Sequence, residues 1–121
     1  MKLEVLRMEF SVCKAKSLAD IDFSGEFCFI GKTDEEISVV CAVENVPPDV
    51  LERDDGWKAF RIAGKLDFSM VGVLSKLSSL LAEHSIGIFA VSTYHTDYIL
   101  TKKENFQAAL DILKAAGYEV A

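Results

Sequence analysis

The sequence predicts an α+β protein whose single compact body is built from two halves. Half of its 121 residues are hydrophobic and 26% are charged, which is typical of a globular chain with its own core. Strand-like apolar runs fill the first half, whereas two amphipathic, helix-like stretches alternate with strand-like runs in the second. These observations predict helices packed on a sheet.

The first half, residues 1–55, is expected to be rich in strands and short of helix. Lys2–Ala15 keeps mostly to the alternation of apolar and polar side chains that a strand requires, and Ser17–Asp20 has room for one helical turn at most. Phe27–Ile30 and Ile37–Val43 are apolar at nearly every residue, as in strands covered on both faces. A polar turn joins these two predicted strands.

A polar linker is expected to separate the halves. Pro47 and Pro48 lack the amide proton that a central strand must donate, and the charged run Glu52–Gly56 follows them. The boundary is therefore placed around residue 55, and the second half is residues 56–121.

The second half has the predicted order β-α-β-β-α-β. Helices are predicted over Ser69–His84 and Glu104–Ala116, because apolar residues recur in each at spacings of three and four, and Gly117 ends the second helix. The predicted strands are Trp57–Ile62, Ile88–Tyr94, Asp97–Thr101 and Tyr118–Val120. This order defines the split βαβ, or ferredoxin-like, unit. Its helices cover one face of the sheet, yet the strand residues 88–91 are apolar on both faces, so the first half, a partner chain or both are expected to cover the other face, in a composite fold that forms a dimer.

Composition and charge exclude several classes of function. The formal net charge of −6, with no basic cluster longer than Lys102-Lys103, argues against nucleic acid as a partner. Charges interrupt the N-terminal segment, so neither a signal peptide nor a membrane span is expected there. Cys13, Cys28 and Cys41 are widely spaced in apolar runs, which indicates buried, reduced thiols and a cytoplasmic location. No closely spaced ligand pairs suggest zinc, and no cofactor is predicted.

The junction Gly64–Leu74, where a strand gives way to a helix, is the main candidate site. Peptide N–H groups near Met70–Val73 have no partner within the helix and suit a carboxylate. Gly72 has no side chain, so a ligand can approach its backbone closely, although the same residue can simply permit tight helix packing.

A hydroxyl-rich hairpin, Ser92–Tyr98, is the second candidate. Asp97, or Asp67 in the junction, can hold an ammonium group, but Asp97 is also a common turn residue. The junction and the hairpin are expected at opposite ends of their own sheet, so that they would meet only between two units or through a bend.

Catalytic and metal-binding alternatives have weaker support. Ser69 or Ser92 with His95 and Asp97 supplies the residue types of a hydrolase triad, but no nucleophile elbow surrounds either serine. His95 with Asp97 and Asp67 is a sparse set of metal ligands.

Three segments, residues 56–62, 66–74 and 91–98, resemble the ACT domain family, in particular small CASTOR-like proteins built from tandem ACT modules. The first half resembles a shortened ACT module. The resemblance implies amino-acid sensing, with the ligand held between two ACT modules by Asp67, Ser69, Met70, Gly72, Val73, Thr93, Tyr94, Thr96 and Asp97. An arginine-binding member of the family has an acidic residue at the position of Met70 and an aromatic one at that of Thr96, so a smaller or more apolar amino acid is expected here.

The predicted function is therefore that of a non-enzymatic, amino-acid-binding regulatory protein. It is expected to form a cytoplasmic homodimer and to act on a regulated enzyme. The alternatives are a ligand-free structural module for dimerisation or docking and, less favoured, a small hydrolase.

Overall fold

The computed structural model describes residues 1–65 and 72–121, and these divide into two compact units. The first unit is Met1–Arg7 with Lys58–Ala121, and the second unit is Met8–Trp57. The elements in chain order are β1 (Lys2–Lys14), a 3₁₀ turn (Leu18–Asp20), β2 (Cys28–Lys32), β3 (Ile37–Ala42), a second 3₁₀ turn (Val43–Asn45), β4 (Glu52–Ile62), α1 (Val73–Glu83), β5 (Phe89–Ser92), β6 (Asp97–Lys102), α2 (Lys103–Ala115) and β7 (Glu119–Val120). The predicted halves 1–55 and 56–121 stay a prediction.

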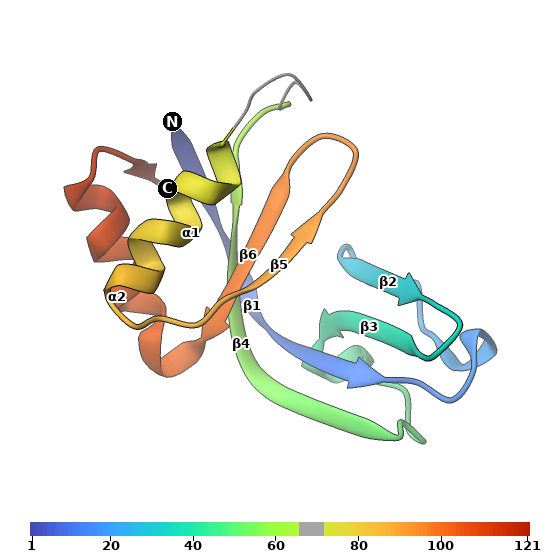
Figure 1. Cartoon of the computed structure of the whole chain (residues 1–121). Coiled ribbons are helices and arrows are strands. Elements are labelled where there is room, and N and C mark those ends of the chain that lie inside the picture. The colour runs from blue at the N-terminus through green and yellow to red at the C-terminus, as the bar shows by residue number, and fades with distance from the viewer. Residues whose placement is uncertain (66–71) are drawn as a thin grey trace. The chain divides into compact units, whose positions relative to one another are not determined.

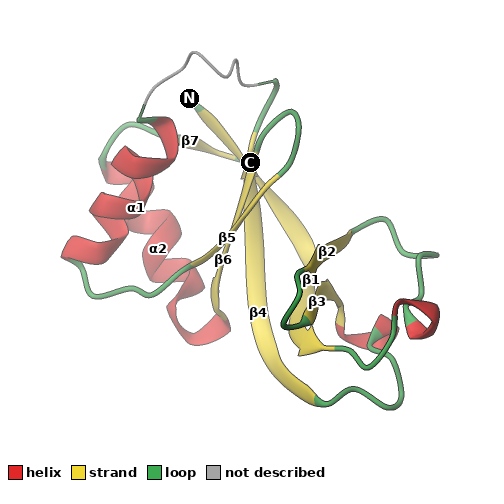
Figure 2. Cartoon of the chain, turned by 45° about the vertical axis from the view of Figure 1, so that its right-hand side comes forward, coloured by secondary structure: helices red, strands yellow, loops and turns green. Residues whose placement is uncertain are grey.

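The first unit has two helices on one face of a sheet, as Figures 1 and 2 show. Its strands follow the order β7-β1-β4-β6-β5, with β5 antiparallel to β6 and β7 parallel to β1. The predicted α+β, ferredoxin-like fold is confirmed, with one addition. The start of β1 lies between β4 and β7, since Lys2 accepts a hydrogen bond from Ala63 and Leu3 accepts one from Ala121, both at 2.9 Å.

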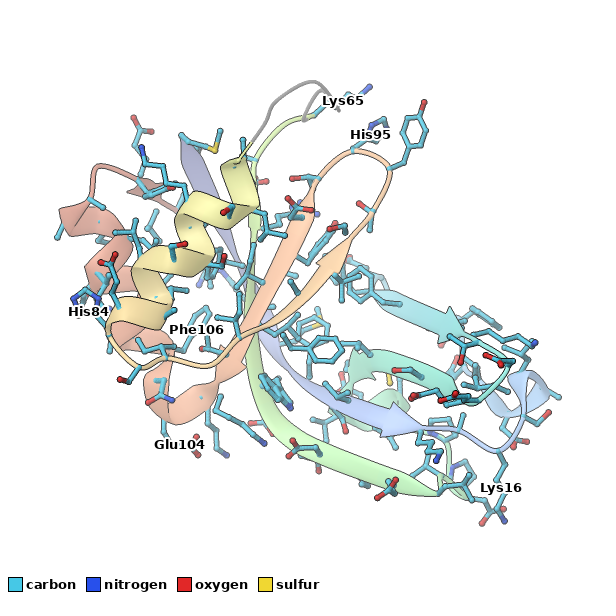
Figure 3. The ribbon with its side chains drawn as sticks, viewed as in Figure 1. Lys16, Lys65, His84, His95, Glu104 and Phe106 are labelled. Carbon is cyan, nitrogen blue, oxygen red and sulfur yellow. The ribbon has the colours of Figure 1, made fainter. Side chains whose placement is uncertain are left out.

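The apolar faces of both helices form the core of this unit. Leu77 and Leu81 of α1 are fully buried, as the spacing of apolar residues predicted. The buried face of α2 consists of Phe106, Ala109, Leu110 and Leu113. Phe106 reaches from α2 toward the sheet and packs on Phe60 of β4, with ring centroids 6.3 Å apart (Figure 3). Each leucine or phenylalanine side chain among them contributes roughly 1.5–3 kcal/mol when fully buried.

Helix α1 begins later than predicted. Gly72 has a left-handed backbone with a φ of 81°, which is incompatible with a helix interior, so it precedes the helix instead of lying in its first turn. The first helical hydrogen bond runs from the Lys76 N–H to the Gly72 carbonyl at 2.8 Å. The predicted helical residues Ser69–Val71 lie outside the described residues.

The second unit is a sheet of short strands in which β3 lies between β2 and β1. Ile21, Val39 and Cys41 are buried in a small core of this unit. The expectation that both strands of the hairpin are covered on both faces holds for β3 but is wrong for β2. Ile30 is 38% exposed and the end of β2 is exposed, because β2 lies at the end of the strand order.

The predicted linker Glu52–Gly56 is also wrong, because these residues form the start of β4. Alternate residues of a strand share a face, and Arg53 and Asp55 use that geometry to form a two-pronged ion pair with both N···O distances at 3.1 Å. A charged run is therefore compatible with an exposed strand end.

Within residues 1–65 and 72–121, no helix has the length and apolar character needed to cross a membrane.

Candidate ligand site

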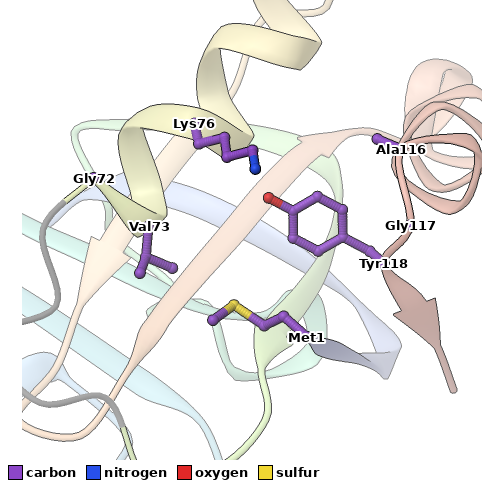
Figure 4. A pocket seen from close by; sticks show the side chains of 7 residues that line it. All are labelled: Met1, Gly72, Val73, Lys76, Ala116, Gly117 and Tyr118. Atoms are coloured by element: carbon purple, nitrogen blue, oxygen red, sulfur yellow. The ribbon is translucent and has the colours of Figure 1, made fainter.

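A pocket of about 290 Å³ lies at the start of α1 in the first unit. It is lined by Met1, Gly72, Val73, Lys76, Ala116, Gly117 and Tyr118. The side chains of Met1, Val73, Lys76 and Tyr118 project into the same space, and the Lys76 amine and the Tyr118 hydroxyl point toward one another (Figure 4). Three parts of the chain, which are the start of β1, the first turn of α1 and the turn after α2, thus converge here.

The first turn of α1 gives this pocket a positive potential. Since the helical ladder begins with the Lys76 N–H, the amides of Val73, Leu74 and Ser75 have no acceptor within the helix. The helix dipole adds partial positive charge at the same end, and the Lys76 ammonium adds a full one. Such a set favours a carboxylate or another small anion.

Gly72 and Gly117 shape the pocket through their backbones. Both have left-handed conformations, with φ values of 81° and 102°. Gly117 ends α2, where the N–H groups of Gly117 and Tyr118 close the helix onto Lys114 and Leu113, each at 3.0 Å. The turn places Tyr118 at the pocket. A β-carbon added at Gly72 would have no atom of the described residues within 4 Å, its chain neighbours aside, so alanine there would meet backbone strain and not a clash.

The β5–β6 hairpin lies at the same end of the first unit as the junction, which corrects the expectation of opposite ends. Lys65, at the end of the described part of the junction, and His95, at the hairpin tip, are found together there (Figure 3). The buried Thr96 hydroxyl donates a hydrogen bond of 2.7 Å to the Ile62 carbonyl at the end of β4. The reason is topological, because β4 and β5 finish at the same end of the sheet.

Several polar side chains of the hairpin form hydrogen bonds within it. Thr93 donates to the Thr96 carbonyl through its amide, at 2.8 Å, and through its hydroxyl, at 3.0 Å. The Ser92 hydroxyl donates to Asp97 at 2.6 Å. Tyr94 is 77% exposed and packs edge-on against His95, with ring centroids 5.2 Å apart.

The predicted site residues therefore separate into three groups. Gly72 and Val73 line the pocket, whereas Thr93, Tyr94, Thr96 and Asp97 belong to the hairpin and do not line it. Asp67, Ser69 and Met70 lie outside the described residues. The involvement of all three groups in a ligand site stays a prediction.

Sequence reasoning missed Lys76, Tyr118 and Met1. The spacing of apolar residues alone places Lys76 on the polar, outward face of the helix, whereas its position four residues after Gly72 is the signal that places it over the same turn. Nothing in the sequence connects Met1 or Tyr118 with that turn, because they reach it through the strand pairing of β1 with β7.

The described residues do not have the arrangement that the catalytic alternative requires. A triad needs its histidine between serine and carboxylate, but Ser92 donates directly to Asp97 and His95 contacts Tyr94. Among the residues for which the structure is described, no group of three His, Cys, Asp or Glu side chains is arranged to hold a metal ion.

The geometry defines a class: a ferredoxin-like α+β unit with an anion-favouring pocket at the start of its first helix. The sequence model of the ACT domain family matches residues 52–115, which run from the start of β4 to the end of α2 and make up more than half of the chain. The chain belongs to the ACT domain family.

Two solved structures share the fold of this chain over most of its length. A protein from Agrobacterium tumefaciens is 31% identical with a TM-score of 0.87, over 99% of this chain and 91% of that one. A Vibrio cholerae protein of unknown function, described as a possible transport protein, is 21% identical with a TM-score of 0.72, over 94% and 88% of the two chains. No protein with a curated description matches this chain in sequence.

Aspartate kinases provide further structural neighbours. The enzyme from Clostridium acetobutylicum is 10% identical with a TM-score of 0.68, and the match covers 94% of this chain but 34% of that one. The ligand-free regulatory subunit from Thermus thermophilus is 12% identical with a TM-score of 0.60, over 95% and 96% of the two chains. At these identities the likeness concerns the fold alone.

Proposed function

We propose that this chain is a regulatory ACT domain that binds a small amino acid, with the ligand's carboxylate at the start of α1. The observation that carries the proposal is the pocket in which the first-turn amides of α1 and Lys76 meet the side chains of Met1 and Tyr118. Its volume of about 290 Å³ lies just below the range of about 300–1,000 Å³ typical of small-molecule sites, which suits a ligand of amino-acid size.

The lining favours an amino acid with a short or apolar side chain. Among its described residues Lys76 has the one charged side chain and none is acidic, so the best-matched ligand group is a carboxylate. Lys76 would repel a second positive charge, which supports the expectation from Met70 and Thr96 that arginine is disfavoured. In this proposal Asp97 or Asp67 receives the ammonium group, and the hydroxyls of Ser69 and Thr93 assist.

The proposal extends to the assembly and the partner. A homodimer would place the ligand between two ACT modules, and a cytoplasmic enzyme would be the regulated partner. The neighbours that are aspartate kinases, or regulatory subunits of one, support a regulatory role through the shared fold. We also propose that the ACT modules are arranged in tandem, as in CASTOR-like proteins.

A thermal-shift series across the twenty amino acids tests the proposal, with reduced, metal-free protein. A ligand present at one hundred times its Kd stabilises the folded state by about 2.7 kcal/mol, which raises Tm by several degrees. We expect such a shift for one amino acid or a few related ones. If none shifts Tm at millimolar concentration, the sensing function is wrong and a structural dimerisation or docking module takes its place.

A further inference from the structure

Three cysteines on different strands share one face of the sheet in the second unit. In the register of the strands, Cys28 of β2 lies directly opposite Cys41 of β3, and Cys13 of β1 lies opposite Val39. Val39 and Cys41 are two residues apart on β3, so their side chains point to the same face. The thiols therefore gather at one place, with Cys41 between the other two.

The hydrogen-bond pattern shows which type of pair Cys28 and Cys41 form. The turn between β2 and β3 is closed by a hydrogen bond of 2.9 Å from the Thr33 N–H to the Glu36 carbonyl. Opposed pairs in an antiparallel ladder alternate between hydrogen-bonded and non-hydrogen-bonded. Counting outward from that bond, through the pairs 32/37, 31/38, 30/39 and 29/40, makes Cys28–Cys41 a non-hydrogen-bonded pair.

A second hydrogen bond gives the same result independently. Ile37 accepts from the Ala15 N–H at 2.9 Å, so the peptide groups of Ile37 face β1. Because this orientation repeats at every second residue, those of Cys41 also face β1 and leave its β2 side without ladder bonds.

This pairing has the separation that a disulfide needs. Non-hydrogen-bonded pairs have Cα atoms about 4.5 Å apart, within the range of about 4.4–6.8 Å for disulfides. Cys13 and Cys41 are diagonal neighbours whose thiols are close enough to hydrogen-bond, but diagonal Cα atoms lie about 7–8 Å apart, too far for a disulfide without moving the backbone. The register thus selects one pair among the three thiols.

The two partners also differ in access to solvent. Cys28 is partly exposed on β2, whereas Cys41 and Cys13 have 2% and 3% of their surface exposed. Burial raises the pKa of Cys41 to about 12, and burial with the nearby Asp22 carboxylate also raises the pKa of Cys28. An oxidant in solution therefore meets Cys28 first, and the low thiolate fraction makes the reaction slow.

We propose that Cys28 and Cys41 form a site of reversible oxidation, which hydrogen peroxide closes into a cross-strand disulfide between β2 and β3. The Cys28 sulfur attacks one peroxide oxygen, the O–O bond breaks, and water leaves to give a sulfenic acid. The Cys41 sulfur then attacks the Cys28 sulfur, the S–O bond breaks, and a second water leaves. Two thiols thereby lose two electrons and two protons to one peroxide, and a dithiol reductant reverses the reaction.

Peptide mapping tests this site directly in the full chain. The reduced protein is treated with hydrogen peroxide, its remaining thiols are alkylated in denaturant, and trypsin then separates the three cysteines by cutting at Arg7, Lys16, Lys32 and Arg53. We expect peptide 17–32 linked to peptide 33–53, with Cys13 alkylated, and loss of the link after reduction. A link through Cys13, a link between chains, or over-oxidation of Cys28 without any link would overturn the proposal.

Two variants separate the roles of the thiols. Cys28→Ser, at the partly exposed position, should abolish the link, whereas Cys13→Ser should keep it. Because wild-type protein alone gives the peptide map, a folding defect in a variant does not remove the test. An unchanged link in Cys28→Ser would show that the assigned pair is wrong.

Discussion

Lys76 is the one charged side chain among the described residues that line the pocket at the start of α1. We expect Lys76→Met to weaken binding of the amino acid about 10- to 100-fold, because a hydrogen bond to a charged group contributes about 1.5–3 kcal/mol. Lys114→Met, in the last turn of α2, removes the same charge from a residue outside the pocket and should leave affinity unchanged. Calorimetric titration of both variants measures the difference; equal affinities would remove Lys76 from the site.

Gly72 and Gly64 offer a matched pair for separating backbone strain from ligand contact. Both have left-handed backbones, with φ values of 81° and 87°, and neither would bring a β-carbon within 4 Å of a described atom beyond its chain neighbours. Alanine at either position should lower the free energy of unfolding by roughly 1–2 kcal/mol. Only Gly72→Ala should also weaken binding, since Gly64 does not line the pocket. If both variants lost the same affinity, backbone strain alone would account for the weaker binding.

Cys41 makes stability depend on alkaline pH. Burial, and then the neighbouring Cys13 and Cys28, raise its pKa from 9.0 to about 12, so the unfolded thiol loses its proton before the folded one. The native state then binds more protons than the unfolded state, and its stability falls as pH rises from about 9 toward about 12. Urea unfolding with reductant should show a smaller fall for Cys41→Ala than for wild type. The same fall in both would contradict the burial of this thiol.

At the scale of elements, the β5–β6 hairpin is anchored to the end of β4 by Thr96. Thr96→Val removes the donor to the Ile62 carbonyl at nearly constant volume, and leaving that buried carbonyl unpaired costs about 1–3 kcal/mol. Thr93→Val is the control, because Thr93 is exposed and its amide keeps the bond to the Thr96 carbonyl. Chemical denaturation without ligand measures both. If Thr96→Val is as stable as the control, the anchor has no energetic role.

The elements most accurately predicted from sequence were those with strong periodicity. The buried faces of α1 and α2 follow from apolar spacing alone, and Gly117 ends α2 as its residue type predicts. The start of β4 was missed because its charged residues look like a linker. Their strand conformation follows from the place of β4 beside β1 in the sheet, a long-range pairing that composition does not reveal.

The candidate site was predictable only where it is local. Gly72 and Val73, which line the pocket, were predicted because a glycine at the start of an amphipathic helix is a local signal. Lys76 belongs to a helix face that polarity alone assigns to solvent. Met1 and Tyr118 reach the pocket through the pairing of β1 with β7, which joins the two ends of the chain and has no signature in either segment.

For the whole molecule, the proposed homodimer makes a prediction about assembly. If two ACT modules share the ligand, amino-acid binding and dimerisation are linked, and each must strengthen the other by the same factor. Analytical ultracentrifugation should therefore give a lower dimer dissociation constant with the ligand than without it. A monomer at all concentrations, with undiminished binding, would restrict the site to one copy.

The central claim is that the start of α1 holds the acid end of an amino acid. It is tested most directly by calorimetric titration of wild type and Lys76→Met with the best amino acid and with its carboxamide. The four affinities form a thermodynamic cycle, in which the ligand's carboxylate and Lys76 should show a coupling energy of about 1.5–3 kcal/mol. A coupling near zero, with the carboxamide bound as tightly as the acid, would contradict the account.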